Sequence, residues 1–301
     1  SGNIWVIKTD YEGNLQWDEL YSENNYNYSH CIEEIPEGYI ITGESGENND
    51  DIDIIVIKIT YFGNVLWSKI YDDFEEGIIS SGFSIKNNSS DSYIITGFID
   101  MWDDQYTLTD VLLLLIDSEG NEIRHNIYAG IEFPGAGDKG YSLDLTDDGG
   151  YIIGGYTYGS LSEFSLLKID NEGVLEWNKV FSSNYTDIGE DVIKTSDGGY
   201  LIVGITGFYG WGNGQDRDIW IIKTDSQGNQ IDWDNMIDEP GHWEIANKEF
   251  QKTISATLGN IKNNEKIISE LIEFDKLGLD YIKIGFFFTN FSDIRELFVL
   301  I

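Results

Sequence analysis

Five lysines of this sequence stand inside apolar runs, where a lysine can either take part in chemistry or serve the fold. Four of the runs resemble one another, and they are 4–10 (IWVIKTD), 54–60 (IIVIKIT), 165–170 (SLLKID) and 219–225 (IWIIKTD). The fifth run, 279–288 (LDYIKIGFFF), contains Lys283. An amine shielded in an apolar strand has a lowered pKa and can act as a nucleophile, whereas an amine near a strand end ordinarily reaches solvent. The surroundings of each lysine decide between these interpretations.

The four similar runs share a setting that favours a structural role. Lys8, Lys58, Lys168 and Lys223 each stand five residues before a turn glycine, and Leu115 takes this position in another copy. We interpret these lysines as residues near strand ends, beside aspartates, whose amines reach solvent. The leucine in one copy argues against any required chemistry.

The elements around these lysines repeat. One phrase is an apolar strand, a glycine turn and a second strand, and its turn glycines are Gly13, Gly63, Gly120, Gly173 and Gly228. Asp10, Asp117, Asp170 and Asp225 precede four of these glycines, and we expect each carboxylate to accept hydrogen bonds from nearby backbone N–H groups. A second phrase alternates with the first, at 37–43, 91–97, 149–155 and 198–204. Each unit of about fifty residues therefore predicts four short antiparallel strands, the size of a β-propeller blade.

Residues 3–235 resemble the bacterial and archaeal repeat proteins built from DGGYIIGGYT…DIWLIKTDSNGNLQW units. The resemblance implies a mainly β fold, with about four full propeller units and an N-terminal half unit. We expect this repeat domain to span 1–238. Such repeats occur in many surface and secreted proteins, so the resemblance implies a binding or scaffold module whose ligand is a protein, a glycan or a cation.

The composition changes near Pro240. Residues 241–301 hold nine acids and seven bases, whereas the rest of the chain carries a net charge of −34. In this second piece, 252–261 reads as a strand and 263–278 has the apolar spacing of an amphipathic helix that ends at Gly278. Strand, helix and strand predict a short α/β segment at 245–301, and Lys283 is therefore no copy of the four repeated lysines.

Two motifs here, SATLGNI (255–261) and GLDYIKIGFF (278–287), resemble the (5-formylfuran-3-yl)methyl phosphate synthases of methanofuran biosynthesis. The resemblance implies part of a (β/α)-barrel and a lyase that condenses two molecules of glyceraldehyde 3-phosphate. It also implies that Lys283 is the catalytic residue that forms the Schiff base. The resemblance covers only about 50 residues, and Asn260 replaces the family's usual aspartate. Because two strands cannot close a barrel, we expect this segment to be inactive as it stands.

The bulk composition excludes several classes. With 54 acids, 18 bases and a net charge of −36, the chain is not expected to bind nucleic acid or anionic lipid. No apolar run is long enough to span a bilayer, and Cys31 is the only cysteine. Acidic loops at 49–54, 100–105 and 213–218 lack a defined calcium-ligand spacing, so we favour solvated loops. No metal or cofactor is expected, since His30, His125 and His242 also lack a motif.

Three hypotheses follow. The chain is an acidic propeller that binds or scaffolds, a fragment of a methanofuran-synthesis lyase, or a chimeric gene model that joins two reading frames. The chain begins with Ser1 inside a strand pattern, so we read it as a fragment and leave the compartment open. A dominant propeller would favour the cell surface or exterior, and a working synthase would favour the cytoplasm.

Overall fold

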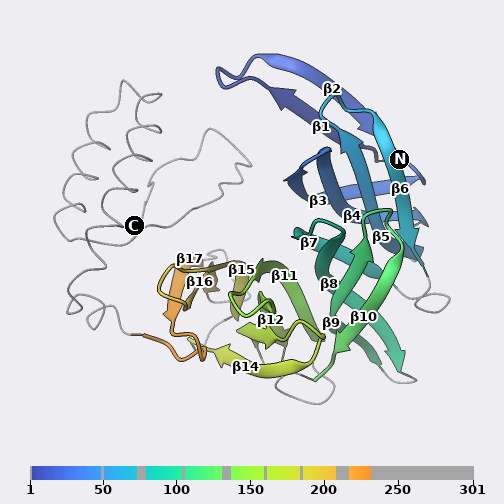
Figure 1. Ribbon diagram of the computed structural model, residues 1–301. Coiled ribbons are helices and arrows are strands. Elements are labelled where there is room, and N and C mark those ends of the chain that lie inside the picture. The colour runs from blue at the N-terminus through green and yellow to red at the C-terminus, as the bar shows by residue number, and fades with distance from the viewer. Residues whose placement is uncertain are drawn as a thin grey trace. The chain divides into compact units, whose positions relative to one another are not determined.

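The computed structural model describes residues 2–48, 51–72, 79–103, 106–130, 137–158, 161–183, 186–207 and 217–231. Within these residues every regular element is a strand, and every strand pairs antiparallel with a neighbour in the chain (Figure 1). The chain divides into two compact units, Ser1–Gln230 and Ile231–Ile301. The described strands belong to the first unit and confirm the prediction of repeating, four-stranded antiparallel sheets.

Five sheets follow one another along the chain. Sheet 1 contains β1 (Ile4–Thr9) and β2 (Leu15–Tyr21). Sheet 2 contains β3 (Tyr26–Ile35), β4 (Gly38–Asn48), β5 (Asp51–Thr60) and β6 (Val65–Tyr71). Sheet 3 contains β7 (Ser80–Ser89), β8 (Ser92–Asp103), β9 (Tyr106–Asp117) and β10 (Glu122–Tyr128). Sheet 4 contains β11 (Gly137–Leu145), β12 (Tyr151–Tyr158), β13 (Ser162–Ile169) and β14 (Leu175–Phe181). Sheet 5 contains β15 (Thr186–Lys194), β16 (Tyr200–Gly207) and β17 (Arg217–Thr224).

Sheets 2, 3 and 4 have the four strands expected of a full unit, and sheet 1 is the expected half unit. Sheet 5 differs from the expectation of a fourth full unit, because it has three strands among the described residues. Its chain continues to a single bridge between Thr224 and Gln230, and the expected fourth strand lies mostly beyond the described range. The expected domain boundary at 238–245 and the α/β segment at 245–301 lie outside the described residues altogether.

The hairpin turns form as their residues predict. Gly13 has a φ of 86°, a value that a residue with a Cβ adopts only with strain, and its N–H donates to the Asp10 carbonyl (3.1 Å). One Asp10 carboxylate oxygen accepts from the Glu12 and Asn14 backbone N–H groups at 3.0 and 2.9 Å. The same two contacts recur at Asp117, Asp170 and Asp225. The predicted role of these aspartates is thus confirmed.

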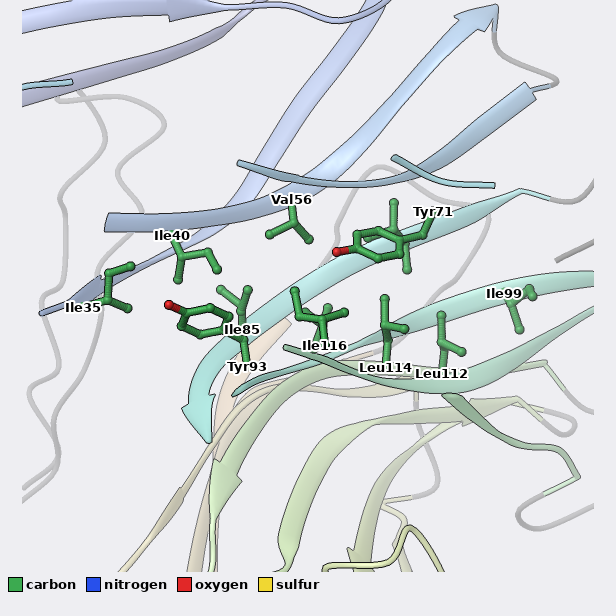
Figure 2. Close-up of a cluster of buried hydrophobic side chains, with 12 residues drawn as sticks. Ile35, Ile40, Val56, Tyr71, Ile85, Tyr93, Ile99, Leu112, Leu114 and Ile116 are labelled. Carbon is green, nitrogen blue, oxygen red and sulfur yellow. The ribbon is translucent and has the colours of Figure 1, made fainter. Parts of the chain in front are cut away.

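Sheets 2, 3 and 4 each bury both faces. This explains why their strands contain continuous apolar runs, without an alternation of apolar and polar residues. Along 111–116 (VLLLLI), alternate side chains point to opposite sides of β9. Leu112, Leu114 and Ile116 belong to a cluster shared with sheet 2 (Figure 2), and Val111 and Leu113 to a cluster shared with sheet 4. Burial of each such side chain contributes about 1.5–3 kcal/mol to the free energy of folding. Face-to-face packing of consecutive sheets is therefore the main source of stability.

A repeated polar contact links the last strand of a sheet to the next sheet. The indole Nε1 of Trp17 donates to the Tyr61 carbonyl and that of Trp67 donates to the Ser118 carbonyl, both at 3.0 Å. In sheet 3 Arg124 replaces the tryptophan, and its guanidinium donates to the equivalent carbonyl, that of Asn171 (2.6 Å). Two different side chains therefore satisfy the same acceptor in the neighbouring turn.

Candidate functional site

The residue with the clearest chemical hypothesis, Lys283, lies outside the described residues, as do both motifs that resemble the synthase family. The Schiff-base role of Lys283 therefore stays a prediction. The candidate site consists of residues of the repeat domain.

The repeated lysines do not reach solvent as expected. Lys58, Lys168 and Lys223 are buried, with only 3–6 % of each residue exposed. Lys168 Nζ lies 2.9 Å from Asp148 Oδ2 and 3.0 Å from Glu176 Oε2. The expectation of snorkelling amines is thus wrong for these three residues, because the hairpin between the first two strands of a sheet brings a carboxylate to the third strand.

The positive charge of Lys168 and the negative charges of Asp148 and Glu176 stabilise one another. Burial lowers the pKa of Lys168, but hydrogen bonds and charges from Asp148 and Glu176 outweigh it and raise the pKa above its usual value. Burial raises the pKa of Asp148, while hydrogen bonds from Thr146, Lys168 and Gly150 bring it down to about 2. Lys168 is therefore a protonated anchor of the hairpin and not a neutral nucleophile.

A different set of residues lies on the first strands of sheets 2 to 5. The pairing of β3, β7, β11 and β15 with the following strand shifts by one residue at the same place in sheets 2 to 5. The extra residue at such a β-bulge is left unpaired, and its side chain is re-aimed. These bulge residues are His30, Phe83, Tyr141 and Glu190, and we call them the bulge row.

The last glycine of the repeated phrase makes room for each bulge. A Cβ on Gly97 would lie 1.7 Å from the Ser81 carbonyl oxygen, and a Cβ on Gly155 would lie 1.8 Å from that of Lys139. These glycines are part of the sequence phrase at 91–97 and 149–155, so the phrase contained a signal for the bulge that was not recognised from sequence.

Three members of the bulge row stack from one sheet to the next. The ring centroids of His30 and Phe83 lie 4.4 Å apart, and those of Phe83 and Tyr141 lie 4.8 Å apart in an edge-to-face arrangement. Phe98 and Tyr156, on the second strands of sheets 3 and 4, extend the aromatic surface. The ring centroids of Phe98 and Phe83 lie 5.7 Å apart, as do those of Tyr156 and Tyr141. Sheets 2, 3 and 4 thus contribute to one continuous aromatic surface.

Carboxylates lie at both ends of this surface. Glu44 accepts a hydrogen bond from the Tyr26 hydroxyl (3.1 Å) and lies 3.7 Å from His30 Nε2. Burial raises the pKa of Glu44, but His30, Ser81 and Tyr26 more than offset this effect, so the pKa lies below its ordinary value. At the other end Glu190 is exposed. Burial is the main cause that raises the pKa of Tyr141, and Tyr156 and the charge of Glu190 raise this pKa further. The surface therefore combines aromatic rings with negative charge.

One cation already lies on this aromatic surface. Lys139 Nζ lies 3.5 Å from the centroid of the Phe98 ring. Burial lowers the pKa of Lys139, although the charges of Asp100 and Glu44 act in the opposite direction. The contact is a cation–π interaction, in which the negative face of the ring attracts the ammonium group.

The acidic loops considered for calcium lie only partly within the described ranges. In the part of the chain that the structure describes, no group of three or more His, Cys, Asp or Glu side chains is arranged to hold a metal ion. That same part contains no helix that is long and apolar enough to cross a membrane. Comparison of the chain with protein-family models and with curated proteins finds no significant match.

Proposed function

We propose that the repeat domain is an acidic β-propeller binding module, and that its bulge row binds a positively charged segment of a partner protein. In this arrangement the sheets are blades, their first strands lie toward a common axis, and the bulge row follows the inner surface. The observation that carries the proposal is the stacking of His30, Phe83 and Tyr141 across three sheets at 4.4 and 4.8 Å.

The regular packing of the sheets supports the propeller. Each sheet has its strands in chain order, and three large clusters of buried side chains join sheets 2 to 3, 3 to 4 and 4 to 5 in turn. Blades of four antiparallel strands that pack face to face in this way are typical of propellers. The bulge at the same position of β3, β7, β11 and β15 places equivalent side chains on the first strands of sheets 2 to 5, as expected if these strands line one inner surface.

The chemistry of the bulge row supports a cationic ligand. Aromatic faces attract lysine and arginine side chains, by about 0.5–2 kcal/mol for each contact. Glu44 and Glu190 add negative charge at the two ends of the row. The net charge of −36 also raises the local concentration of basic partners and their association rate.

The test is a titration of the full chain with a fluorescent oligo-arginine peptide at fixed ionic strength. Phe83→Leu and Tyr141→Leu remove the ring faces without changing the net charge. We expect each to weaken binding several-fold and the double variant to weaken it about tenfold or more. Tyr11→Leu, at a turn residue that is 94 % exposed and outside the row, should leave the affinity unchanged.

The matched variants separate site binding from simple attraction between opposite charges. If the double variant binds the peptide as tightly as the unmodified chain does, the bulge row is not the binding surface and the proposal fails. If Tyr11→Leu reduces the affinity as much as Phe83→Leu, the proposal fails for the same reason.

A further inference from the structure

Lys139 is a cation without an ionic partner on the aromatic surface. It lies on β11, two residues before the bulge residue Tyr141, and its Nζ lies 3.5 Å from the centroid of the Phe98 ring. The charges of Asp100 and Glu44 act on it from a greater distance. Among the described residues, no carboxylate forms an ion pair with Lys139. The ring of Phe98 is therefore the main contact of its ammonium group within these residues.

The place that Lys139 occupies is not a favourable one for its charge. Burial is the largest influence on the pKa of Lys139 and lowers it, and the charges of the two carboxylates reverse only part of this effect. Burial also acts on Lys168, but there carboxylates in direct contact outweigh it and raise the pKa. The surroundings of Lys139 thus favour its charged form less than water does. A lysine side chain is long and flexible, so its amine can move from the ring into solvent at little cost.

Lys139 also covers a ring that a cationic ligand would use. Phe98 belongs to the aromatic surface, but only 7 % of this residue is exposed. The centroid of the Phe83 ring lies 5.7 Å from that of Phe98, and the ammonium group of Lys139 lies 3.5 Å from it. A ligand therefore contacts the face of Phe98 that Lys139 occupies only after Lys139 has moved away.

The side chain of Asp100 indicates which cation takes the place of Lys139. Phe98 and Asp100 are two residues apart on β8, so their side chains point to the same face of the sheet. Asp100 Oδ1 is buried, and it accepts no hydrogen bond from the described residues. A guanidinium group is flat and carries five N–H donors, so it stacks on a ring and donates to a carboxylate at the same time. An ammonium group is a compact point charge, and Lys139 leaves Asp100 Oδ1 without a donor.

We propose that Lys139 is an internal competitor of the ligand, and that an arginine side chain of the partner protein displaces it. The arginine stacks on Phe98 and donates a hydrogen bond to Asp100, while Lys139 moves into solvent. Lys139 thereby lowers the affinity for all cationic segments and favours those that offer arginine over those that offer lysine. This role depends on the bulge row being the binding surface, as proposed above.

The experiment titrates the full chain with the fluorescent oligo-arginine peptide and with an oligo-lysine peptide of the same length. Lys139→Met should bind oligo-arginine about tenfold more tightly than the unmodified chain, because the ring of Phe98 no longer has a resident cation. Lys69→Met is the matched control, since it removes the same charge from β6, where Lys69 contacts Asn121 of sheet 3. It should leave the affinity nearly unchanged. Asp100→Asn, added to Lys139→Met, should remove the preference for arginine over lysine.

A second measurement follows Lys139 in the unmodified chain. The ring current of Phe98 should shift the proton resonances of the last methylene group of Lys139 upfield, because this group adjoins the ammonium group that lies over the ring. In a chain with isotope-labelled lysine, this signal is identified by its absence from Lys139→Met. Saturation with oligo-arginine should return it to the ordinary range of lysine.

The outcomes separate this inference from the proposed function. If Lys139→Met binds oligo-arginine no more tightly than Lys69→Met does, Lys139 is no competitor, although the bulge row remains the binding surface. An upfield signal that persists at saturation would overturn the displacement as well. A preference for arginine that survives Asp100→Asn would overturn the role of Asp100. If oligo-arginine binds neither the unmodified chain nor Lys139→Met, the bulge row is not the binding surface and both proposals fail.

Discussion

Lys223 Nζ lies 2.8 Å from Asp197 Oδ2, and the lysine side chain is only 4 % exposed whereas the aspartate side chain is 31 % exposed. The two residues stand on different elements of sheet 5, β17 and the turn before β16. Burial raises the pKa of Asp197, but hydrogen bonds from Lys223, Thr195 and Gly199 bring it below its ordinary value. The ion pair therefore fastens the turn to the third strand of the sheet.

The difference in burial predicts unequal costs for removing the two partners. Asp197→Ala leaves a buried ammonium group without its carboxylate and should destabilise the chain by about 3 kcal/mol. Lys223→Met leaves a more exposed carboxylate and an apolar side chain like Leu115, so we expect a cost below about 1 kcal/mol. Urea unfolding of both variants and of the double variant measures this. A cost for Lys223→Met equal to that for Asp197→Ala would contradict the structural role.

Arg124 should be replaceable by tryptophan. Trp17 and Trp67 donate from Nε1 to the carbonyls that correspond to Asn171, the acceptor of Arg124. Arg124→Trp should therefore keep the stability of the chain within about 0.5 kcal/mol, whereas Arg124→Met should cost about 1 kcal/mol, since it leaves the acceptor without a donor. Thermal unfolding distinguishes the two variants. An equal loss of stability in both would contradict the equivalence of the tryptophan and arginine donors.

The raised pKa of Asp110 should make the free energy of unfolding fall as the pH rises. The residue is buried, and burial followed by the charges of Asp138 and Asp100 raises its pKa from 3.8 to about 6. Between these values the folded chain holds a proton that the unfolded chain has lost, so the free energy of unfolding decreases as the pH rises through this window. Asp110→Asn should raise stability at pH 7 by about 1–3 kcal/mol and have little effect near pH 4.

Asp117 provides a control of opposite sign. A side-chain hydrogen bond from Asn121, followed by backbone hydrogen bonds, lowers the pKa of Asp117. Its contribution to stability is present above the ordinary pKa and is lost as the pH falls through the lowered value. Asp117→Asn should therefore reduce the melting temperature at neutral pH and lose this effect in acid. If Asp110→Asn and Asp117→Asn shift the stability in the same direction at pH 7, the conclusion that Asp110 has a raised pKa in the folded chain is wrong.

The turns could be predicted from the sequence because their determinants are local. Asp10 and Gly13 are three residues apart, and their chemistry alone specifies the hairpin. The burial of Lys168 could not be predicted in this way, since Asp148 is twenty residues earlier and the pairing of β12 with β13 brings the two together. Tyr141 was missed for a related reason: a bulge breaks the two-residue period, and stacking between sheets leaves no trace in a local pattern.

The hypothesis for Lys283 rests on sequence alone and has a direct chemical test. The chain is incubated with glyceraldehyde 3-phosphate and borohydride, and adducts are located by mass spectrometry. We expect no fast, selective adduct on Lys283 and no furan product, because the matching segment is too short to close a barrel. Lys283→Met is the control for labelling of other lysines. Selective labelling of Lys283 together with turnover would show that the segment is an intact synthase site.

Hydrogen–deuterium exchange of the full chain, with and without the oligo-arginine peptide, tests the central claim most directly because it locates the binding surface. We predict that the peptide slows exchange in β3, β7 and β11 around His30, Phe83 and Tyr141. Slowed exchange confined to acidic stretches such as 49–54, with these three strands unchanged, would contradict it.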